Sequence, residues 1–293
     1  PLLQSSAASD VYKRQTLQPG DVIDGGAGAD VLKLSLSGTL TGDHSISGVE
    51  MSNVEEIQIN GFQTADGQDY TLDMALITGV TTLGLVSSSA SNDITISNVP
   101  TIVNVKAMNG GGDLTVTYAA TASAGVADIQ ALNVNNYTGT VSLAGVETIN
   151  LDSSGVKSTI AALTATSMTS LNVTGDAKLT ITGAIENGTT TLDASAHTGG
   201  GSYTLTPTAT TGIAFTGGSG NETAIVGASL SQLTSIDGGA GVDTMSISDA
   251  DTLTVLTGPM VSNVEVLDAS ATDATEYNTS YLPGVTALSS SAA

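Results

Sequence analysis

Residues 168 to 181 read MTSLNVTGDAKLTI, and this stretch contains both parts of a phrase that recurs along the 293-residue chain. The first part spaces Met168, Leu171 and Val173 as apolar, two spacers, apolar, one spacer, apolar. Its last three positions alternate as they do in a strand with one buried face. The same spacing recurs at Val80, Leu83 and Leu85; at Ile129, Leu132 and Val134; at Val146, Ile149 and Leu151; and at Val261, Val264 and Val266.

The second part of the phrase is a turn residue followed by an apolar, hydroxyl, apolar triplet, as in AKLTI at 177 to 181. Such a triplet predicts a short strand with a hydroxyl on one face and apolar side chains on the other. It recurs as GQDYTL at 67 to 72, SNDITI at 91 to 96, GGDLTV at 111 to 116, TGTVSL at 138 to 143 and GGSYTL at 200 to 205.

The spacing between phrases predicts the fold class. Leu132, Ile149, Leu171 and Leu192 are separated by 17, 22 and 21 residues. Intervals of about 20 residues that each hold two strands and a polar turn predict an all-β fold, a parallel β-solenoid with coils of that length. A β-sandwich also has short strands at regular spacing and stays the alternative. Leucine-rich repeats share the apolar spacing, but their Asn ladder and helical return do not recur here.

The composition excludes several function classes. The chain has 28 acidic and 6 basic residues, and this excess argues against binding to nucleic acids or anionic membranes. It has no cysteine for disulfides or thiolate metal sites, and no run of about 18 apolar residues that would span a membrane. With no Trp and two Phe, its core must be thin and built from small branched residues, which suits a repetitive β-structure.

The chain divides into two parts by pattern. Residues 1 to 15, PLLQSSAASDVYKRQ, share no pattern with the rest and resemble translated adaptor sequence, so we expect this segment to be non-native and the chain to be a fragment. Residues 16 to 293 are expected to form one elongated β-repeat domain with glycine-rich modules at 22 to 60 and 215 to 270. Residues 126 to 132 and 157 to 168 could each form a short turn of helix.

A glycine-rich acidic loop occurs twice, as VIDGGAGADVLKL at 22 to 34 and SIDGGAGVDTMSI at 235 to 247. Ser-Asn-Val-Glu follows both copies, at 52 to 55 and 262 to 265, so the loop heads a repeated module. Glycines permit positive φ and bring backbone carbonyls close, while aspartate supplies carboxylate oxygens. Calcium, which takes 6 to 8 oxygen ligands at about 2.3 to 2.6 Å, suits such a loop.

Both loops fit the nonapeptide G-G-x-G-x-D-x-U-x, in which U is a large aliphatic residue. On these residues the chain resembles the RTX, or hemolysin-type, calcium-binding repeat proteins, and in character it is most similar to bacterial S-layer or adhesin-like surface proteins. The resemblance implies an ion between loops of successive coils, so GGSGNE at 217 to 222, one coil before the second copy, becomes its partner. The implied metal-site residues are Asp24, Gly26, Gly28 and Asp30 in the first copy, and Gly218, Gly220, Glu222, Asp237, Gly239, Gly241 and Asp243 in the second.

These features predict a calcium-binding structural or adhesive protein, secreted to the bacterial cell surface and S-layer-like, whose coils calcium stabilises. Its expected partners are calcium ions, copies of itself or cell-surface glycans. We expect no enzyme activity, because G-x-S-x-G and H-E-x-x-H are absent and His44 and His197 lie in polar turns where they are expected to be solvated. The alternatives are the repeat region of a larger secreted RTX enzyme whose catalytic domain is missing, and a calcium-independent adhesin or fibre.

Overall fold

The computed structural model describes residues 3–4, 10–14, 17–36, 44–61, 68–186, 188–206, 211–226, 234–247, 261–269 and 282–289. Every helix or strand in these ranges is a β-strand, which confirms the all-β prediction. The suggested helical turns at 126 to 132 and 157 to 168 are therefore wrong, because neither segment contains a helix and their residues lie in strands, bends and one isolated turn. No helix in the described part of the chain has the length and hydrophobicity to cross a membrane.

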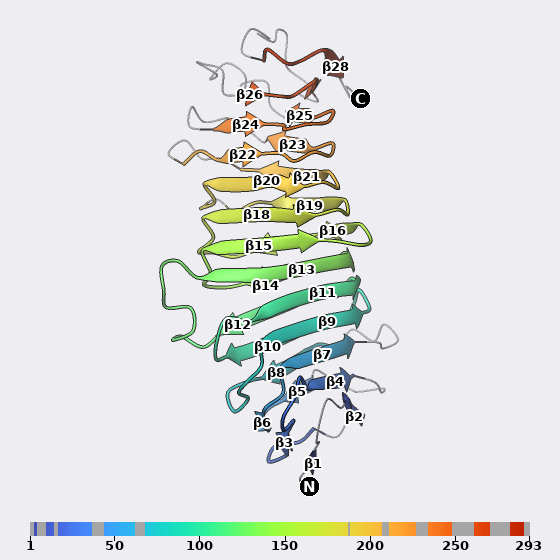
Figure 1. Cartoon of the computed structure of the whole chain (residues 1–293), viewed down its shortest axis with the longest axis vertical. Helices are drawn as coiled ribbons and strands as arrows, with labels where there is room; N and C mark the ends of the chain where they lie inside the picture. The colour runs from blue at the N-terminus through green and yellow to red at the C-terminus, as the bar shows by residue number, and fades with distance from the viewer. Residues whose placement is uncertain are drawn as a thin grey trace. The chain divides into compact units, whose positions relative to one another are not determined.

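The chain forms two compact units, Pro1–Glu147 and Thr148–Ala293. In the first unit all strand pairs are parallel and successive strands of a sheet come from successive coils (Figure 1). One sheet contains β2 (Asp10–Arg14), β4 (Val31–Ser35), β7 (Glu56–Gly61), β9 (Thr82–Ser88), β11 (Asn104–Gly110) and β13 (Ile129–Tyr137). A second contains β5 (His44–Ile46), β8 (Tyr70–Asp73), β10 (Ile94–Val99), β12 (Leu114–Tyr118) and β14 (Val141–Leu143), and a small third contains β1 (Leu3–Gln4), β3 (Val22–Asp24) and β6 (Glu50–Ser52).

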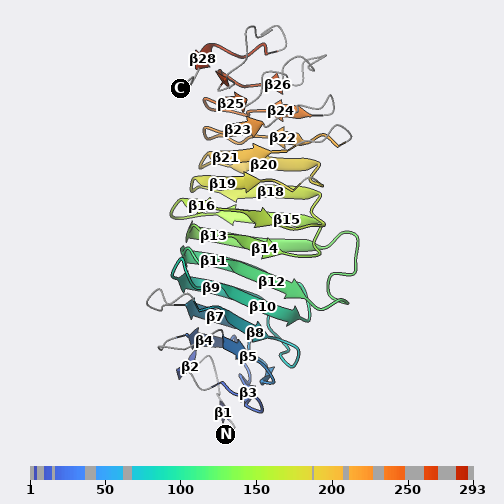
Figure 2. The same ribbon diagram turned by 180° about the vertical axis from the view of Figure 1, so that it is seen from behind.

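The second unit repeats this architecture (Figure 2). One sheet contains β15 (Thr148–Ser153), β18 (Ser170–Gly175), β20 (Thr191–His197), β22 (Ala214–Thr216), β24 (Ser235–Asp237) and β26 (Val261–Ser262). The other contains β16 (Ser158–Ile160), β19 (Leu179–Ala184), β21 (Gly201–Leu205), β23 (Thr223–Val226), β25 (Thr244–Ile247), β27 (Val266–Ala269) and β28 (Ala287–Ser289), and β17 (Leu163–Thr164) is a short strand after β16.

The strand register confirms the β-solenoid. Ile149 pairs with Leu171 and Leu171 with Leu192, which are the offsets of 22 and 21 residues that the repeats predict. Paired residues elsewhere in the described ranges are separated by between 19 residues, from Val99 to Tyr118, and 28 residues, from Val22 to Glu50. The coils are thus slightly longer on average than expected. The strand pairs among the described residues are parallel, which excludes the β-sandwich, whose sheets are antiparallel.

The interior of each unit is a stack of mainly aliphatic side chains, and most strands contribute one to three of them. Residues of the predicted phrases such as Leu171, Val173 and Ile181 are fully buried, because alternate strand positions face inward. Two positions depart from the predicted phrase. Ile129 is 58% exposed, and Val266 is half-buried beside the buried Leu267.

The neighbour of Ile129 explains the first departure. Gln130 is fully buried and donates from Nε2 to the Val103 carbonyl at 2.7 Å, while the Tyr118 hydroxyl donates to its Oε1. A satisfied amide therefore takes the interior position of that coil, and the isoleucine beside it points outward.

Candidate metal centre

The second glycine loop and its upstream partner lie one coil apart, as predicted. β22 pairs with β24 so that Thr216 faces Asp237, and β23 pairs with β25 so that Thr223 faces Thr244. The intervening loops are stacked through backbone hydrogen bonds, the Gly217 N–H donating to the Asp237 carbonyl at 2.7 Å. The Thr244 N–H donates to the Glu222 carbonyl at 2.9 Å, which places Glu222 beside the end of the next loop.

The leading glycines of these loops are required by close backbone packing. A Cβ built on Gly217 would lie 1.9 Å from the carbonyl oxygen of Gly238, and one on Gly238 would lie 1.8 Å from that of Asn263. Gly239 and Gly241 add a second requirement, because their φ values are +91° and +139°. The spacing of the motif is thus explained by tight stacking of coils, whether or not an ion is bound.

We call the place where these glycine loops stack the glycine corner. Three acidic residues, one from each of three successive coils, form a ladder there. The Glu222 N–H donates to Asp243 Oδ1 at 2.7 Å, and the Asp243 N–H donates to Glu265 Oε2 at 2.8 Å. Glu222 and Asp243 are only 1% and 2% exposed. Glu222 Oε2 accepts the Gly218 N–H at 3.2 Å, but Glu222 Oε1 and Asp243 Oδ2 are buried without a hydrogen-bond partner. Buried carboxylate oxygens without partners are costly and need an explanation.

Burial and mutual repulsion disfavour the state in which Glu222 and Asp243 are both ionised with no positive charge beside them. Burial raises the pKa of Glu222 to about 7, and the nearby negative charge of Asp243 contributes to this rise. Burial also raises the pKa of Asp243, with further contributions from the charges of Glu265 and Asp237. A proton or a cation would relieve this repulsion, since each supplies positive charge and no basic side chain of the described residues affects the pKa of either carboxyl group.

Asp237 has a different role from Glu222 and Asp243. Its Oδ1 accepts the Gly239 N–H at 3.2 Å and the Asn263 side-chain amide at 2.7 Å. Asn263 adopts a left-handed conformation with φ of 50°, which turns the chain after β26. We call this arrangement, an aspartate that ends one strand and accepts the amide of a left-handed Asn in the next coil, an Asp–Asn clip. The three acidic residues predicted to bind the metal at this loop pair therefore do not act together. The Glu222 N–H is hydrogen-bonded to Asp243, whereas Asp237 mainly forms a turn.

The first glycine loop has the same local geometry. Asp24 Oδ1 accepts the Gly26 N–H at 3.0 Å and the Asn53 amide at 2.8 Å, which makes a second Asp–Asn clip. The Asp30 N–H donates to Glu55 Oε2 at 2.7 Å, as the Asp243 N–H does to its glutamate. Asp30 is 1% exposed, and neither of its carboxylate oxygens has a hydrogen-bond partner.

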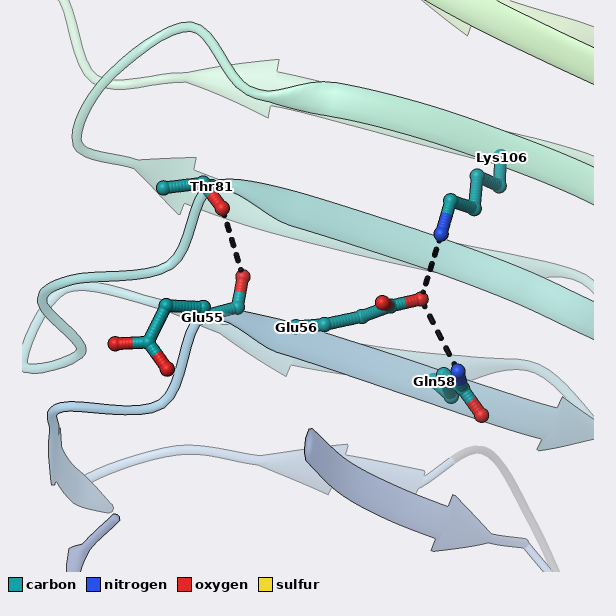
Figure 3. Close-up of polar contacts among 5 residues, drawn as sticks. All are labelled: Glu55, Glu56, Gln58, Thr81 and Lys106. Atoms are coloured by element: carbon teal, nitrogen blue, oxygen red, sulfur yellow. Dashed lines mark hydrogen bonds and ion pairs between the residues drawn. The ribbon is translucent and has the colours of Figure 1, made fainter. Parts of the chain in front are cut away.

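Glu55 and Glu56 are adjacent but lie in different environments (Figure 3). The Glu55 carbonyl accepts the Thr81 hydroxyl at 3.2 Å, which ties this corner to the next coil. Glu56 Oε1 accepts Lys106 Nζ at 2.9 Å and the Gln58 amide at 3.1 Å. Although burial alone would raise the pKa of Glu56, these two groups hold it below its ordinary value. Glu56 is thus neutralised by a lysine, whereas Asp30 is not.

A third Asp–Asn clip was not anticipated from the sequence. Asp73 Oδ1 accepts the Ala75 N–H at 3.0 Å and the Asn98 amide at 2.9 Å, and Asn98 has φ of 55°. In all three clips the left-handed Asn is the middle residue of a Ser-Asn-Val tripeptide, at 52 to 54, 97 to 99 and 262 to 264. This repeated tripeptide could have predicted the third clip from the sequence. Because Asp73 has no glycine loop, the clip is a device for closing a coil and does not by itself indicate a metal.

The donor atoms at both corners are oxygens, which fits a hard cation such as calcium. Within the described ranges, however, no three His, Cys, Asp or Glu side chains are positioned to hold a metal ion together. An ion would therefore need backbone carbonyls or water as well as the carboxylates. The carbonyl of Gly218 already accepts the Ala240 N–H at 2.8 Å, and Gly220, Gly239 and Gly241 serve the close packing of the two loops. Gly26 and Gly28 have φ of +89° and +137°, which matches Gly239 and Gly241.

The two histidines have unlike environments. His44 is exposed and lies edge-on to Tyr70, with ring centroids 6.3 Å apart. The expectation of a solvated His197 is wrong, since this residue ends β20 and is fully buried. Its Nε2 donates to the Ala177 carbonyl at 2.9 Å, and the Tyr203 hydroxyl lies 3.4 Å from its Nδ1. His197 is a hydrogen-bonded core residue beneath the glycine corner.

Comparison with protein-family models yields no match for the chain, and a search of curated proteins yields none either. The likeness to calcium-binding repeat proteins therefore depends on the two nonapeptide loops and on the parallel solenoid.

Proposed function

We propose that the protein is a calcium-binding structural or adhesive component of the bacterial cell surface, S-layer-like, in which calcium stabilises the glycine corners of the solenoid. The observation that carries this proposal is the burial of carboxylate oxygens without partners at Glu222, Asp243 and Asp30. Glu222 and Asp243 would hold one ion together with backbone oxygens, and Asp30 would contribute to another. Calcium supplies the positive charge that these buried groups lack.

The mechanism is linkage between folding and ion binding. Each corner exists only in the folded chain, because Glu222 and Asp243 are brought together by strand pairing one coil apart. An ion that binds only this state stabilises it by RT ln(1 + [L]/Kd), or about 2.7 kcal/mol when its concentration is a hundredfold above Kd. A chain with net charge −22 also repels itself, and bound calcium would reduce that repulsion.

We also propose a cell-surface location, because the linkage between folding and calcium binding favours folding outside the cell. Extracellular calcium modules bind in the range of about 10⁻⁴ to 10⁻³ M, so such a chain would stay loose in a low-calcium cytoplasm and fold after secretion. Copies of the chain or cell-surface glycans are its proposed partners. Stacked coils support a structural role, since they build a continuous core from a repeated unit.

Thermal unfolding followed by circular dichroism tests the proposal. We expect about 10 mM calcium, above the range of extracellular modules, to raise the melting temperature of the native chain over that in chelator. Asp243→Asn should remove the part of this increase that the Glu222–Asp243 site contributes. Asp176→Asn is the matched control, because it removes an equal charge from an exposed position of the same unit and should leave the increase intact. Equal melting temperatures in calcium and chelator would refute the proposal.

A further inference from the structure

Glu50 lies in a groove on the outer face of the first unit, between two exposed apolar side chains. Val22 pairs with Glu50, and the bridge between Met51 and Ile77 places Leu76 on the other side of Glu50. All three side chains point outward, because the residue that follows each of them is buried. The groove that they line has a volume of about 380 Å³. We call it the Glu50 groove.

The Glu50 groove combines exposed aliphatic carbon with negative charge. Val22 and Leu76 are 37% and 51% exposed, and they are two of only seven large apolar side chains that are exposed among the described residues. Glu50 is exposed between them, and Asp24, two positions after Val22 on the same face, adds a second carboxylate. No basic side chain of the described residues lines the groove. A partner that fits this surface therefore presents both aliphatic carbon and positive charge.

The second unit presents that combination in the loop between β15 and β16. Val156 is 52% exposed, and Lys157, which follows it, is exposed as well. Lys178 is also exposed and lies one coil later at the equivalent position, because Ser158 pairs with Leu179. We call Val156, Lys157 and Lys178 the basic corner.

The two lysines of the basic corner lie side by side without an ion pair. The strands that follow them are about 4.7 to 4.9 Å apart, so the two positive charges repel each other. Lys106 in the first unit forms an ion pair with Glu56, whereas within the described ranges neither Lys157 nor Lys178 forms one. Both ammonium groups are therefore available to a carboxylate from outside.

Two acidic residues of the same coils make other contacts. Asp152 accepts the Thr174 hydroxyl through Oδ1 at 3.2 Å and the Ser154 hydroxyl through Oδ2 at 2.9 Å. Asp176 Oδ1 accepts the Gly155 N–H at 3.3 Å. Their charges reduce the repulsion between the lysines but do not occupy the ammonium groups.

We propose that the basic corner of one copy of the chain docks into the Glu50 groove of a second copy. Val156 would pack against Val22 and Leu76, while the two ammonium groups would neutralise Glu50 and Asp24. The two surfaces differ, so the contact is heterologous and continues from copy to copy into a ring or an open filament. This inference goes beyond the calcium site and specifies how copies of the chain would meet in the proposed structural role.

The local match must act against a general repulsion. A chain with net charge −22 repels a second copy at long range. At physiological ionic strength this repulsion is screened beyond about 8 Å, whereas the lysines and Glu50 would be in direct contact. The contact is small, so we expect a weak association that grows with protein concentration.

Sedimentation velocity of the full chain at physiological salt and saturating calcium, over a series of protein concentrations, tests the proposal. We expect the native chain to associate, and Glu50→Lys to lower its association constant about tenfold or more, because like charges meet in the contact. Asp69→Lys is the matched control, since it makes the same charge change at an exposed acid of the same unit outside the groove, and it should leave association nearly unchanged.

A charge-reversal mixture separates the specific contact from the net charge. Lys157→Glu combined with Lys178→Glu should also lower association, but this variant adds negative charge to the whole chain. Mixed in equal amounts with Glu50→Lys, it restores opposite charges at the contacts between unlike copies, so association should return close to the native level. Circular dichroism must show that each variant folds.

Four results would overturn the proposal: a native chain that stays monomeric at every concentration, no recovery in the mixture, an equal loss in Asp69→Lys, or a monomeric native chain that binds a lysine-rich peptide through Glu50. In the last case the partner would be a different protein. Failure of the calcium proposal would look different, since it concerns the melting temperature in calcium and chelator and leaves recovery in the mixture unaffected.

Discussion

Glu222→Gln is the sharpest perturbation of the glycine corner, because it removes one buried charge and keeps the size of the side chain. The pKa of Glu222 rises from 4.5 to about 7 in the folded chain, mainly through burial. At about 1.4 kcal/mol for each pKa unit, this rise corresponds to about 3 kcal/mol. A carboxyl group whose pKa is raised by folding favours the folded state below its unfolded pKa, and this stability is lost as the pH rises through the folded pKa.

Without calcium, the native chain should therefore lose up to about 3 kcal/mol of unfolding free energy between roughly pH 4.5 and pH 7.5 through this group alone, and Glu222→Gln should not. Calcium should cancel the loss in the native chain, because it replaces the proton between Glu222 and Asp243. Chemical unfolding across this pH range, in chelator and in calcium, measures both effects. Other groups titrate in both chains, so the difference between the two profiles isolates Glu222.

Two outcomes would refute the reasoning. If the native and Glu222→Gln profiles ran parallel from pH 4.5 to 8 in chelator, Glu222 would not be a strained buried acid. If calcium stabilised Glu222→Gln as strongly as the native chain, the ion would bind elsewhere.

Three further predictions concern a loop glycine, an Asp–Asn clip and the Lys106–Glu56 pair. Gly238→Ala should destabilise the fold by about 2 kcal/mol or more in urea unfolding, because its Cβ would overlap a carbonyl of the next coil, whereas Gly61→Ala, with no contact under 3.5 Å, should be nearly neutral. Asn98→Ala should cost about 1 to 2 kcal/mol, from the lost clip and the left-handed backbone, and Asn98→Gly should recover part of this loss; equal losses would exclude a backbone contribution. Lys106→Met should cost at most about 1 kcal/mol near pH 7, since the pair is partly exposed, and its effect should vanish as the pH falls through the lowered pKa of Glu56; a difference that persists in acid would argue against the ion pair.

The coil repeat could be predicted from the sequence because strand alternation and coil length are both periodic. Leu171 and Leu192, for example, are paired at the offset that their spacing predicts. The errors at Ile129 and Val266 arise where a single hydrogen bond or a shift of one residue decides which side chain faces inward. Gln130 replaces an apolar residue in the core because a carbonyl and a hydroxyl from neighbouring coils satisfy its amide.

At the corner, the offset of one coil between Gly217 and Gly238 was predicted correctly. The partners of the carboxylates were not, because they depend on which backbone N–H each neighbouring coil presents. Glu265 and Glu55 accept hydrogen bonds from Asp243 and Asp30, and neither stands in the nonapeptide.

The sequence by itself determined the all-β solenoid, its coil length and the stacking of the glycine loops. These features depend on the alternation of apolar and polar residues along each strand and on the positions where only glycine leaves room for the next coil. Only the tertiary structure decided that Asp24 and Asp237 form clips and that Glu222 and Asp243 are buried with unpartnered oxygens. The physical reason is that burial and alignment between parallel coils belong to pairs of residues more than twenty positions apart, and no single stretch of sequence records which partner it will meet.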